Sequence, residues 1–413
     1  MWALITAAWA GCQALQGGQV FDGHHLSRAD VVVVDGRIAA VGMPISGLSG
    51  ATYKGRDCEL HELDSSAVLT PGFIDPWTHL GVSEVGLESA TVDSQGSGDP
   101  IRASLRVTEA YNPASIYIPI YRAAGITGAL VIPGDGRVSG QAGWVRLSGS
   151  TQASAVVEPS VALVANLGGE SRAQSLQELR ELIQDARAYQ ANRGAVDGNR
   201  YRSFVEGASR SDLEALAAVA RGEVPLIVQA DRAADIEALI RLADEQRIRL
   251  VIQGAAEAWK HAEALAAAKI PVILTPMVVG PGSFDQVHAR PDNAKLLDQA
   301  GVGVMLRSAH NYNAPALRFA AGNAVRGGLE HDSALAALTS APAAAFGLDD
   351  RGTIAPGQVA DLVLWSADPL EIGTRVLLVL IDGELQSLDN RHKALFERYR
   401  ELPGSPVPAL SVR

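Results

Sequence analysis

Lysine, cysteine and long apolar runs are all scarce in this chain of 413 residues. Lysine occurs only at positions 54, 260, 269, 295 and 393, and the formal net charge is -11. An acidic surface repels phosphate backbones and anionic lipid head groups, so we expect neither nucleic acid nor a membrane surface as a partner. No apolar run approaches the ~20 residues that a membrane-spanning helix needs.

The two cysteines, Cys12 and Cys58, are too few for a disulfide framework, and no Cys-x-x-Cys spacing indicates zinc. The first twelve residues, MWALITAAWAGC, are apolar and end where a bacterial lipoprotein signal places its lipidated cysteine. Against such a signal, no Lys or Arg precedes Cys12, and Trp9 stands where Leu is usual. Residues 1–14 are therefore either this signal or an extension packed on the first strand. The cell envelope or periplasm and the cytoplasm remain equally open as locations.

Composition favours a large globular core. The chain is 47% hydrophobic and 20% charged, values typical of folded globular proteins. Its length fits a barrel of roughly 250 residues with a smaller appended domain.

Short strand patterns occur at both ends of the chain. The turn Asp35-Gly36 separates two apolar runs at 31–34 and 37–42, which predicts a hairpin. Similar runs occur at 360–365 and 375–383. We predict that segments 15–69 and 347–390 form one composite β-sandwich domain, followed by a C-terminal tail at 391–413.

Between residues 70 and 346, buried-looking strand runs alternate with amphipathic helical segments, which predicts an α/β fold with a TIM-like (β/α)8 barrel. The strand runs lie at 128–132, 225–228, 250–252, 271–274 and 303–306, and the helical segments lie at 176–189, 211–221, 233–246 and 256–268. Function in such barrels resides on the loops that follow the carboxyl ends of the strands.

The segment 69–81, LTPGFIDPWTHLG, resembles the first barrel strand of amidohydrolases related to imidazolonepropionase and dihydroorotase. The segments 35–42 (DGRIAAVG) and 352–363 (GTIAPGQVADLV) extend the resemblance over about residues 15–390. It implies hydrolysis of C–N bonds other than peptide bonds, in cyclic amides or related compounds. Relatives use one or two divalent metal ions to activate water, with an aspartate that accepts the proton.

Most of the metal ligands that this resemblance implies are substituted here. His79 is the only one that survives, because Trp77 replaces the first histidine of the pair. Segment 161–170 has no lysine, Gln229 and Asp231 stand at the fifth strand, and Gln253 stands at the sixth. Ala309 takes the place of the catalytic aspartate after the eighth strand. Neutral amides and indole are poor ligands for zinc, so no cofactor is expected unless zinc or another divalent metal binds a rebuilt site.

The remaining polar residues at strand ends are the candidates for a site. Catalytic candidates are His79, Asp231 and His310, and Glu84 and Asp75 are weaker ones. The expected pocket consists of Trp77, His79, Gln229, Asp231, Gln253, Arg307 and His310. Trp77 either fills the space left by a missing metal ion or stacks on a ligand.

Two hypotheses follow for function. One is an amidohydrolase-type enzyme with a degenerate metal centre that acts on a small molecule. The other is a pseudoenzyme, a binding or assembly scaffold that forms homo-oligomers or associates with an active relative.

Overall fold

The computed structural model describes residues 11–96, 100–168, 171–194, 205, 207–276, 281–308 and 314–400. It confirms the predicted fold class. Eight strands form one nearly closed barrel sheet in chain order. They are β11 (Phe73–Thr78), β12 (Ile126–Val131), β13 (Val138–Arg146), β14 (Val156–Asn166), β15 (Leu226–Ala230), β16 (Leu250–Gly254), β17 (Val272–Leu274) and β18 (Val304–Leu306).

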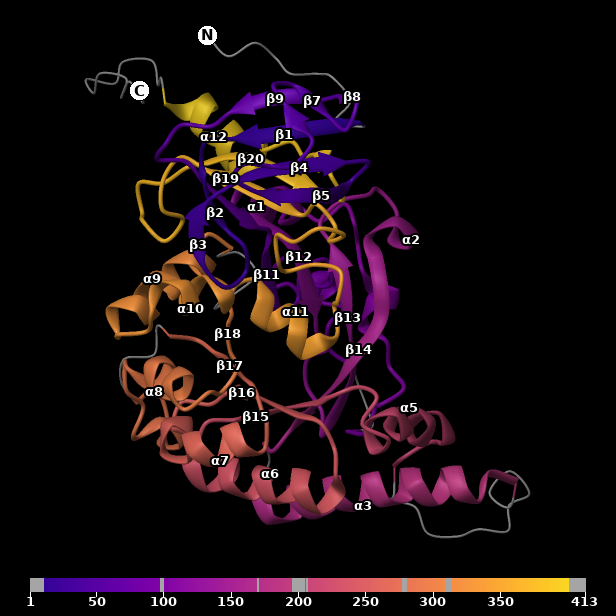
Figure 1. Cartoon of the computed structure of the whole chain (residues 1–413). Helices are drawn as coiled ribbons and strands as arrows, with labels where there is room; N and C mark the ends of the chain where they lie inside the picture. Colours follow the sequence, from indigo (N-terminus) through magenta and orange to yellow (C-terminus); the bar gives the residue numbers. More distant parts are fainter. Residues whose placement is uncertain are drawn as a thin grey trace.

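Helices cover the outside of this sheet, and α3, α6 and α7 lie together at one end of the molecule (Figure 1). In α6, the side chains of Ile236, Leu239 and Leu242 are fully buried, as expected for an amphipathic helix that packs on a barrel. The helices are α1 (Ile118–Ala123), α2 (Gln152–Ala155), α3 (Arg172–Ala191), α5 (Arg210–Ala220), α6 (Ala233–Gln246), α7 (Ala262–Ala267), α8 (Asn293–Gln299), α9 (Ala316–Arg326), α10 (His331–Ala336), α11 (Ser340–Phe346) and α12 (Arg391–Tyr399). None of the described helices is both long and apolar enough to cross a membrane.

The barrel departs from regular strand and helix alternation at β13. This strand runs antiparallel to both β12 and β14, and no helix separates it from β12. Gly128 on β12 makes the pairing feasible because the Trp144 ring lies against it, where a β-carbon would come within 2.2 Å of the ring. The segment 134–140 is a loop only as far as Arg137, because β13 begins at Val138.

The gap between β18 and β11 is closed by backbone from outside the sheet. The amide of Leu306 on β18 donates to the carbonyl of Ala337 (3.2 Å), and the amide of Ile74 on β11 donates to the carbonyl of Leu338 (2.8 Å). The residues just before α11 therefore bridge the first and last strands, which brings the ends of β11 and β18 together.

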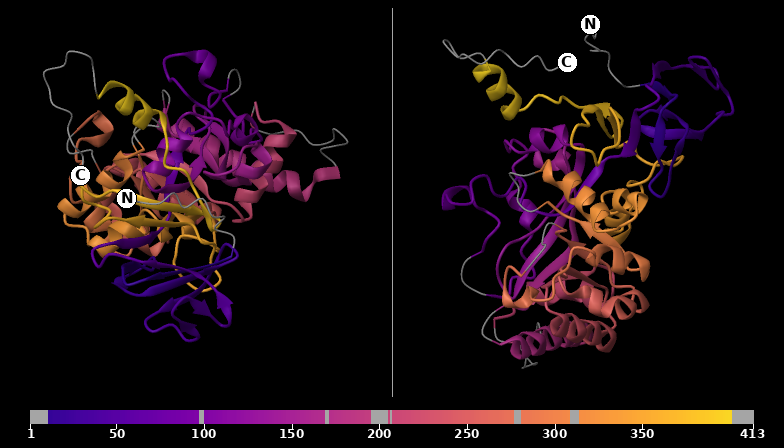
Figure 2. Two further views of the ribbon diagram at one scale, coloured as in Figure 1. Left: turned by 90° about the horizontal axis from the view of Figure 1, so that it is seen from above. Right: turned by 90° about the vertical axis from the view of Figure 1, so that its left-hand side faces the viewer.

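The remaining strands form sheets at one end of the barrel, where strands from both ends of the chain lie side by side (Figures 1 and 2). One sheet has the order β5-β4-β1-β9, and a six-stranded sheet has the order β21-β20-β19-β10-β2-β3. The strands are β1 (Cys12–Gln16), β2 (Gln19–Phe21), β3 (Leu26–Arg28), β4 (Asp30–Val34), β5 (Arg37–Gly42), β6 (Leu48–Ser49), β7 (Thr52–Tyr53), β8 (Arg56–Asp57), β9 (Glu59–Glu62), β10 (Val68–Pro71), β19 (Leu362–Trp365), β20 (Val376–Ile381) and β21 (Glu384–Leu385). The hairpin predicted at Asp35-Gly36 joins β4 to β5.

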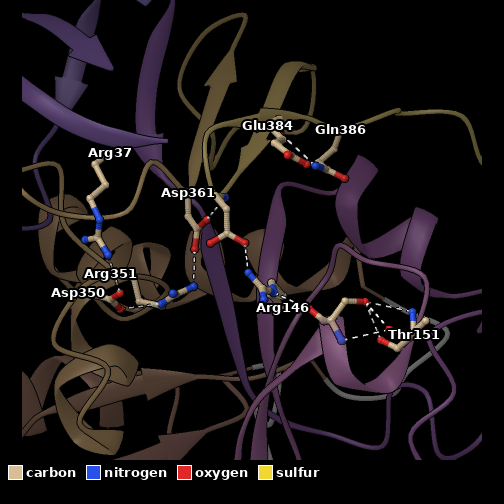
Figure 3. A network of polar contacts seen from close by, with 10 residues as sticks. Arg37, Arg146, Thr151, Asp350, Arg351, Asp361, Glu384 and Gln386 are labelled. Atoms are coloured by element: carbon tan, nitrogen blue, oxygen red, sulfur yellow. Dashed lines mark hydrogen bonds and ion pairs between the residues drawn. The ribbon is translucent and has the colours of Figure 1, made fainter. Parts of the chain in front are cut away.

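A buried charge network connects these sheets to the barrel (Figure 3). Arg351 donates to the carboxylate of Asp361 at 2.8 Å, and Asp361 accepts the backbone amide of Asp382 at 2.7 Å. The carboxylate of Asp382 in turn pairs with Arg146 on β13. Burial raises the pKa of Asp361 to about 6 although Arg351 opposes the shift. Removal of Arg351 would leave the buried Asp361 carboxylate without its ion-pair partner, whereas Arg351 also pairs with Asp350 at 3.0 Å.

The structure joins Cys12 on β1 to Cys58, just before β9, by a disulfide. A sulfur atom in a disulfide cannot also hold a thioether, so of the two alternatives that the sequence leaves open this pairing favours an extension packed on the first strand. Both cysteines are buried among Ala14, Val32 and Tyr53, which explains why two distant sulfur atoms meet.

Reduction of this disulfide should lower stability. The bond closes a loop with a sequence separation of 46 residues, for which chain entropy predicts a loss of about 4 kcal/mol. Thermal unfolding of the oxidised protein, the reduced protein and a Cys12→Ser/Cys58→Ser variant measures this loss. Equal melting temperatures for all three would show that the crosslink contributes nothing.

Candidate functional site

The carboxyl ends of the barrel strands place a layer of polar side chains inside the barrel. Val164, Ile227, Val251, Ile273 and Met305 fill the lumen below it. Side chains alternate along a strand, so the residue two positions later points the same way. Those residues are Asn166, Gln229, Gln253, Thr275 and Arg307, which we call the strand-end layer.

Three members of the strand-end layer are carboxamides in direct register. Asn166 on β14 pairs with Gln229 on β15, and Gln229 pairs with Gln253 on β16. The sequence resemblance implies metal ligands at or next to these three strand ends. Neutral amides there supply hydrogen-bond donors and acceptors but no negative charge.

Arg307 supplies a permanent positive charge to the same layer. In the orientation that satisfies its hydrogen bonds, the side-chain oxygen of Gln253 accepts from Arg307 Nη1 and from the Gly254 amide, both at 3.1 Å. The guanidinium carbon lies 6.0 Å from the centre of the Trp77 ring, at the limit of a cation–π contact. Burial lowers the pKa of Arg307, but guanidinium stays protonated in proteins.

Asp75 on β11 is fully buried, and its side chain faces Ser308, just after β18. Its carboxylate accepts hydrogen bonds from the Ser308 hydroxyl and, at 3.3 Å, from the Trp77 amide. Burial raises its pKa to about 6, although Ser308 and the charge of Arg307 oppose the shift. Tyr121 from α1, hydrogen-bonded to Thr78 at 3.0 Å, borders the same region. Asp75 lines neither of the two cavities described next. Its hydrogen bond with Ser308 instead holds β11 to the residues that follow β18.

A cavity of about 710 Å³ opens at the carboxyl ends of the strands. Trp77, His79, Asn166, Gln229 and Asp231 all line it. A smaller cavity of about 140 Å³ adjoins it and shares Gln229 and Asp231. His79 follows β11 and Asp231 follows β15, so groups from different strands face one space, and Asp135, Asp235 and Asp285 line it as well.

Burial favours the uncharged form of both His79 and Asp231. The pKa of His79 is lowered from 6.5 by burial, so its imidazole is neutral at pH 7. Its Nδ1 lies 2.9 Å from the carbonyl oxygen of Ile132, which places the ring proton on Nδ1. The pKa of Asp231 is raised by burial, although hydrogen bonds from Gln286 (2.9 Å) and the Ala256 amide (3.2 Å) favour its charged form.

The loop between β17 and α8 brings further residues to the cavity that sequence reasoning missed. Gln286 holds Asp231, and Asp285 pairs with Arg172 at the start of α3. Arg172 also pairs with Asp235 at 2.7 Å. Arg172 follows β14 and Asp285 follows β17, so the rule that strand-end loops form the site could have flagged both positions.

The structure brings together most of the pocket predicted from sequence. Trp77, His79, Gln229 and Asp231 line the larger cavity, and Gln253 lines the smaller one. Arg307 lies behind them, in contact with Gln253. His310 and Ala309 fall outside the described residues. Trp77 is 9% exposed and packs with Ile74 and Leu130, so it fills space as well as lining the cavity.

The described residues do not fit a divalent metal ion. In the part of the chain that the structure describes, no group of three or more histidine, cysteine, aspartate or glutamate side chains is placed to hold one. The strand-end layer offers amides, a hydroxyl and a guanidinium. A guanidinium repels a cation, and amides bind zinc poorly.

The arrangement is a barrel with a cavity at its strand ends, and comparisons with known proteins agree with that fold. Residues 303–385 match the model of the Amidohydrolase family. An amidohydrolase from Thermotoga maritima MSB8 has a similar structure, with a TM-score of 0.80 and 26% identity over 91% of this chain and 99% of that one.

Two curated proteins are similar in sequence at low identity. Amidohydrolase tasK from Hapsidospora irregularis is 26% identical over 77% of this chain, and an adenine deaminase from Deinococcus deserti is 28% identical over 81%. The matched regions span 36% and 53% of those proteins, so this chain aligns with only part of each.

The raised pKa of Asp75 should make stability depend on pH. A carboxyl whose pKa is higher in the folded state binds its proton more tightly there, so its stabilising contribution is present at low pH and is lost as pH rises through about 6. Wild type should gain about 1 kcal/mol over Asp75→Asn between pH 7.5 and pH 5. Urea unfolding of both proteins at each pH measures the difference. A constant difference, or one that grows with pH, would contradict the assignment.

Proposed function

We propose that the protein belongs to the amidohydrolase superfamily and hydrolyses a C–N bond, other than a peptide bond, in a small cyclic amide or related compound. The observation that carries the proposal is the shared cavity of His79 and Asp231 at the strand ends. Active sites of such barrels lie at this face. Burial raises the pKa of Asp231 towards neutral pH, as a general base requires, and it keeps the His79 imidazole neutral. Hydrolysis of C–N bonds is also the chemistry that the names of the curated relatives indicate.

The proposed reaction uses the chain's own residues. Asp231 accepts a proton from a water molecule whose oxygen attacks the carbonyl carbon. The same proton then passes to the leaving nitrogen as the C–N bond breaks, which yields a carboxylic acid and an amine. The positive charge of Arg307 favours negative charge that develops on the carbonyl oxygen.

A second candidate is a scaffold that binds a small molecule without turnover. The specific observation in its favour is the strand-end layer, where neutral amides stand at or next to the strand ends at which the resemblance implies metal ligands. In that case the partner is a second copy of this chain or an active relative.

The Asp231→Asn substitution should reduce turnover of the substrate at least 100-fold, because a positioned general base contributes about 10²–10⁴-fold. Hydantoin, 5,6-dihydrouracil and γ-butyrolactone form the first substrate panel. Assays should use protein as purified, with and without added zinc or manganese. Asp244→Asn, an exposed aspartate on α6, is the matched control and should keep full activity.

Three outcomes separate the candidates. Turnover that depends on Asp231 supports the hydrolase. Turnover that Asp231→Asn leaves unchanged would refute the role of this carboxylate. Folded protein without turnover on any cyclic amide tested would count against the hydrolase and leave the scaffold.

A further inference from the structure

Gln229 differs from Asn166 and Gln253, the other two carboxamides of the strand-end layer, in its hydrogen bonding. The side chain of Asn166 donates to the Gly136 carbonyl at 2.9 Å and to the Ser139 hydroxyl at 3.0 Å. Gln253 is 4% exposed and is held by Arg307. The Gln229 side chain is exposed and makes no hydrogen bond to any of the residues that the structure describes.

The position of Gln229 makes its exposure unusual. It lies inside the barrel mouth, at the boundary that the larger and smaller cavities share. The preceding residues of β15, 226–228, are all buried, so this is a fixed strand end and not a surface loop. A polar group held in a cavity on a rigid strand is well placed to recognise a ligand.

Asp231 complements Gln229. It lies two positions further along the chain, faces the same two cavities and is held in place by Gln286 and the Ala256 amide. Gln229 offers a carbonyl acceptor and an NH₂ donor, whereas the charged form of Asp231 offers only acceptors. Together they present a donor and several acceptors within one space.

We propose that Gln229, with Asp231 beside it, recognises the –NH–C(=O)– edge of a cyclic amide or ureide. The Gln229 NH₂ donates to the ligand carbonyl, and its oxygen accepts the adjacent ligand N–H. A second N–H, as in a ureide, meets Asp231. The inference takes its substrate class from the proposed function and adds the residue that recognises the substrate. It concerns binding, so it survives if the protein binds without hydrolysis.

The hydrogen-bonding groups of Gln229 and Asp231 discriminate against ligands that resemble a cyclic amide but lack its N–H. A ligand that lacks the N–H leaves the Gln229 oxygen and the Asp231 carboxylate without a donor, and a site built to hydrogen-bond a group discriminates strongly against its absence. Gln229 and Asp231 therefore select an amide edge over a lactone or an N-alkylated amide.

Hydantoin and 1,3-dimethylhydantoin are the probes, because they share a ring and differ in the two N–H groups. Calorimetry or ligand-observed NMR on the full chain measures their dissociation constants. Hydantoin should bind at least tenfold more tightly than the dimethyl compound. Gln229→Leu should weaken hydantoin binding at least tenfold, and Gln229→Glu should weaken it as well because a carboxylate cannot donate to the carbonyl.

Gln190→Leu is the matched control, since Gln190 is an exposed glutamine near the end of α3 and lines neither cavity. It should bind hydantoin as wild type does. Melting temperatures close to wild type will show that each variant is folded.

Equal affinity for the two probes, unchanged binding by Gln229→Leu, or no hydantoin binding at millimolar concentration would each overturn the inference. The outcome is separable from that of the turnover assay. Hydantoin binding that depends on Gln229, without hydrolysis, refutes only the proposed hydrolase activity. Hydrolysis that Gln229→Leu leaves unchanged refutes only the recognition role of Gln229.

Discussion

Closure of the barrel between β18 and β11 is the constraint on which the site depends. Asp75 on β11 and Ser308, just after β18, are joined by a buried hydrogen bond, and the backbone at residues 337–338 fills the remaining gap. This joint brings Arg307 near Trp77 and completes the layer of side chains across the barrel. The cost is a buried carboxyl with a raised pKa, which the Ser308 hydroxyl, the Trp77 amide and the charge of Arg307 partly offset.

Above this joint, the barrel mouth presents hydrogen-bonding groups beside the buried cation Arg307, and Arg137 and Arg172 line the larger cavity. The Gln253 side chain accepts a hydrogen bond from Arg307, and the Asn166 side chain donates to the β12–β13 connection and to β13. Among the three amides, Gln229 alone faces the cavity without a hydrogen-bond partner in the described chain. Asp231 adds a carboxylate of raised pKa at the same place. Such a mouth can orient a neutral polar molecule, and its chemistry depends on proton transfer by the chain's own groups.

The sequence predicts the barrel because its strand runs are continuous and apolar and its helices are strongly periodic. The predicted helix at 233–246 matches α6 at both ends, and the strand-end residues Gln229 and Gln253 follow directly from counting along such strands. Alternation alone also places Arg307 in the lumen.

Features that depend on distant contacts could not be predicted in this way. The Trp144 ring packs on Gly128 across the β12–β13 pair, a contact that no local pattern reveals, although Asp135-Gly136 between the two strands is itself a hairpin signal. The Cys12–Cys58 bond depends on β1 pairing with β9, and the pair Arg172–Asp285 joins residues from opposite sides of β15 and β16 in the sequence. Each requires knowledge of which elements become neighbours.

A crystal structure of the protein soaked with zinc chloride and hydantoin, with data collected at the zinc absorption edge, tests the central claim most directly. We expect hydantoin density against Gln229 and Asp231, and no anomalous peak among the strand-end layer. An anomalous peak in the barrel mouth with three or more protein ligands would contradict the account.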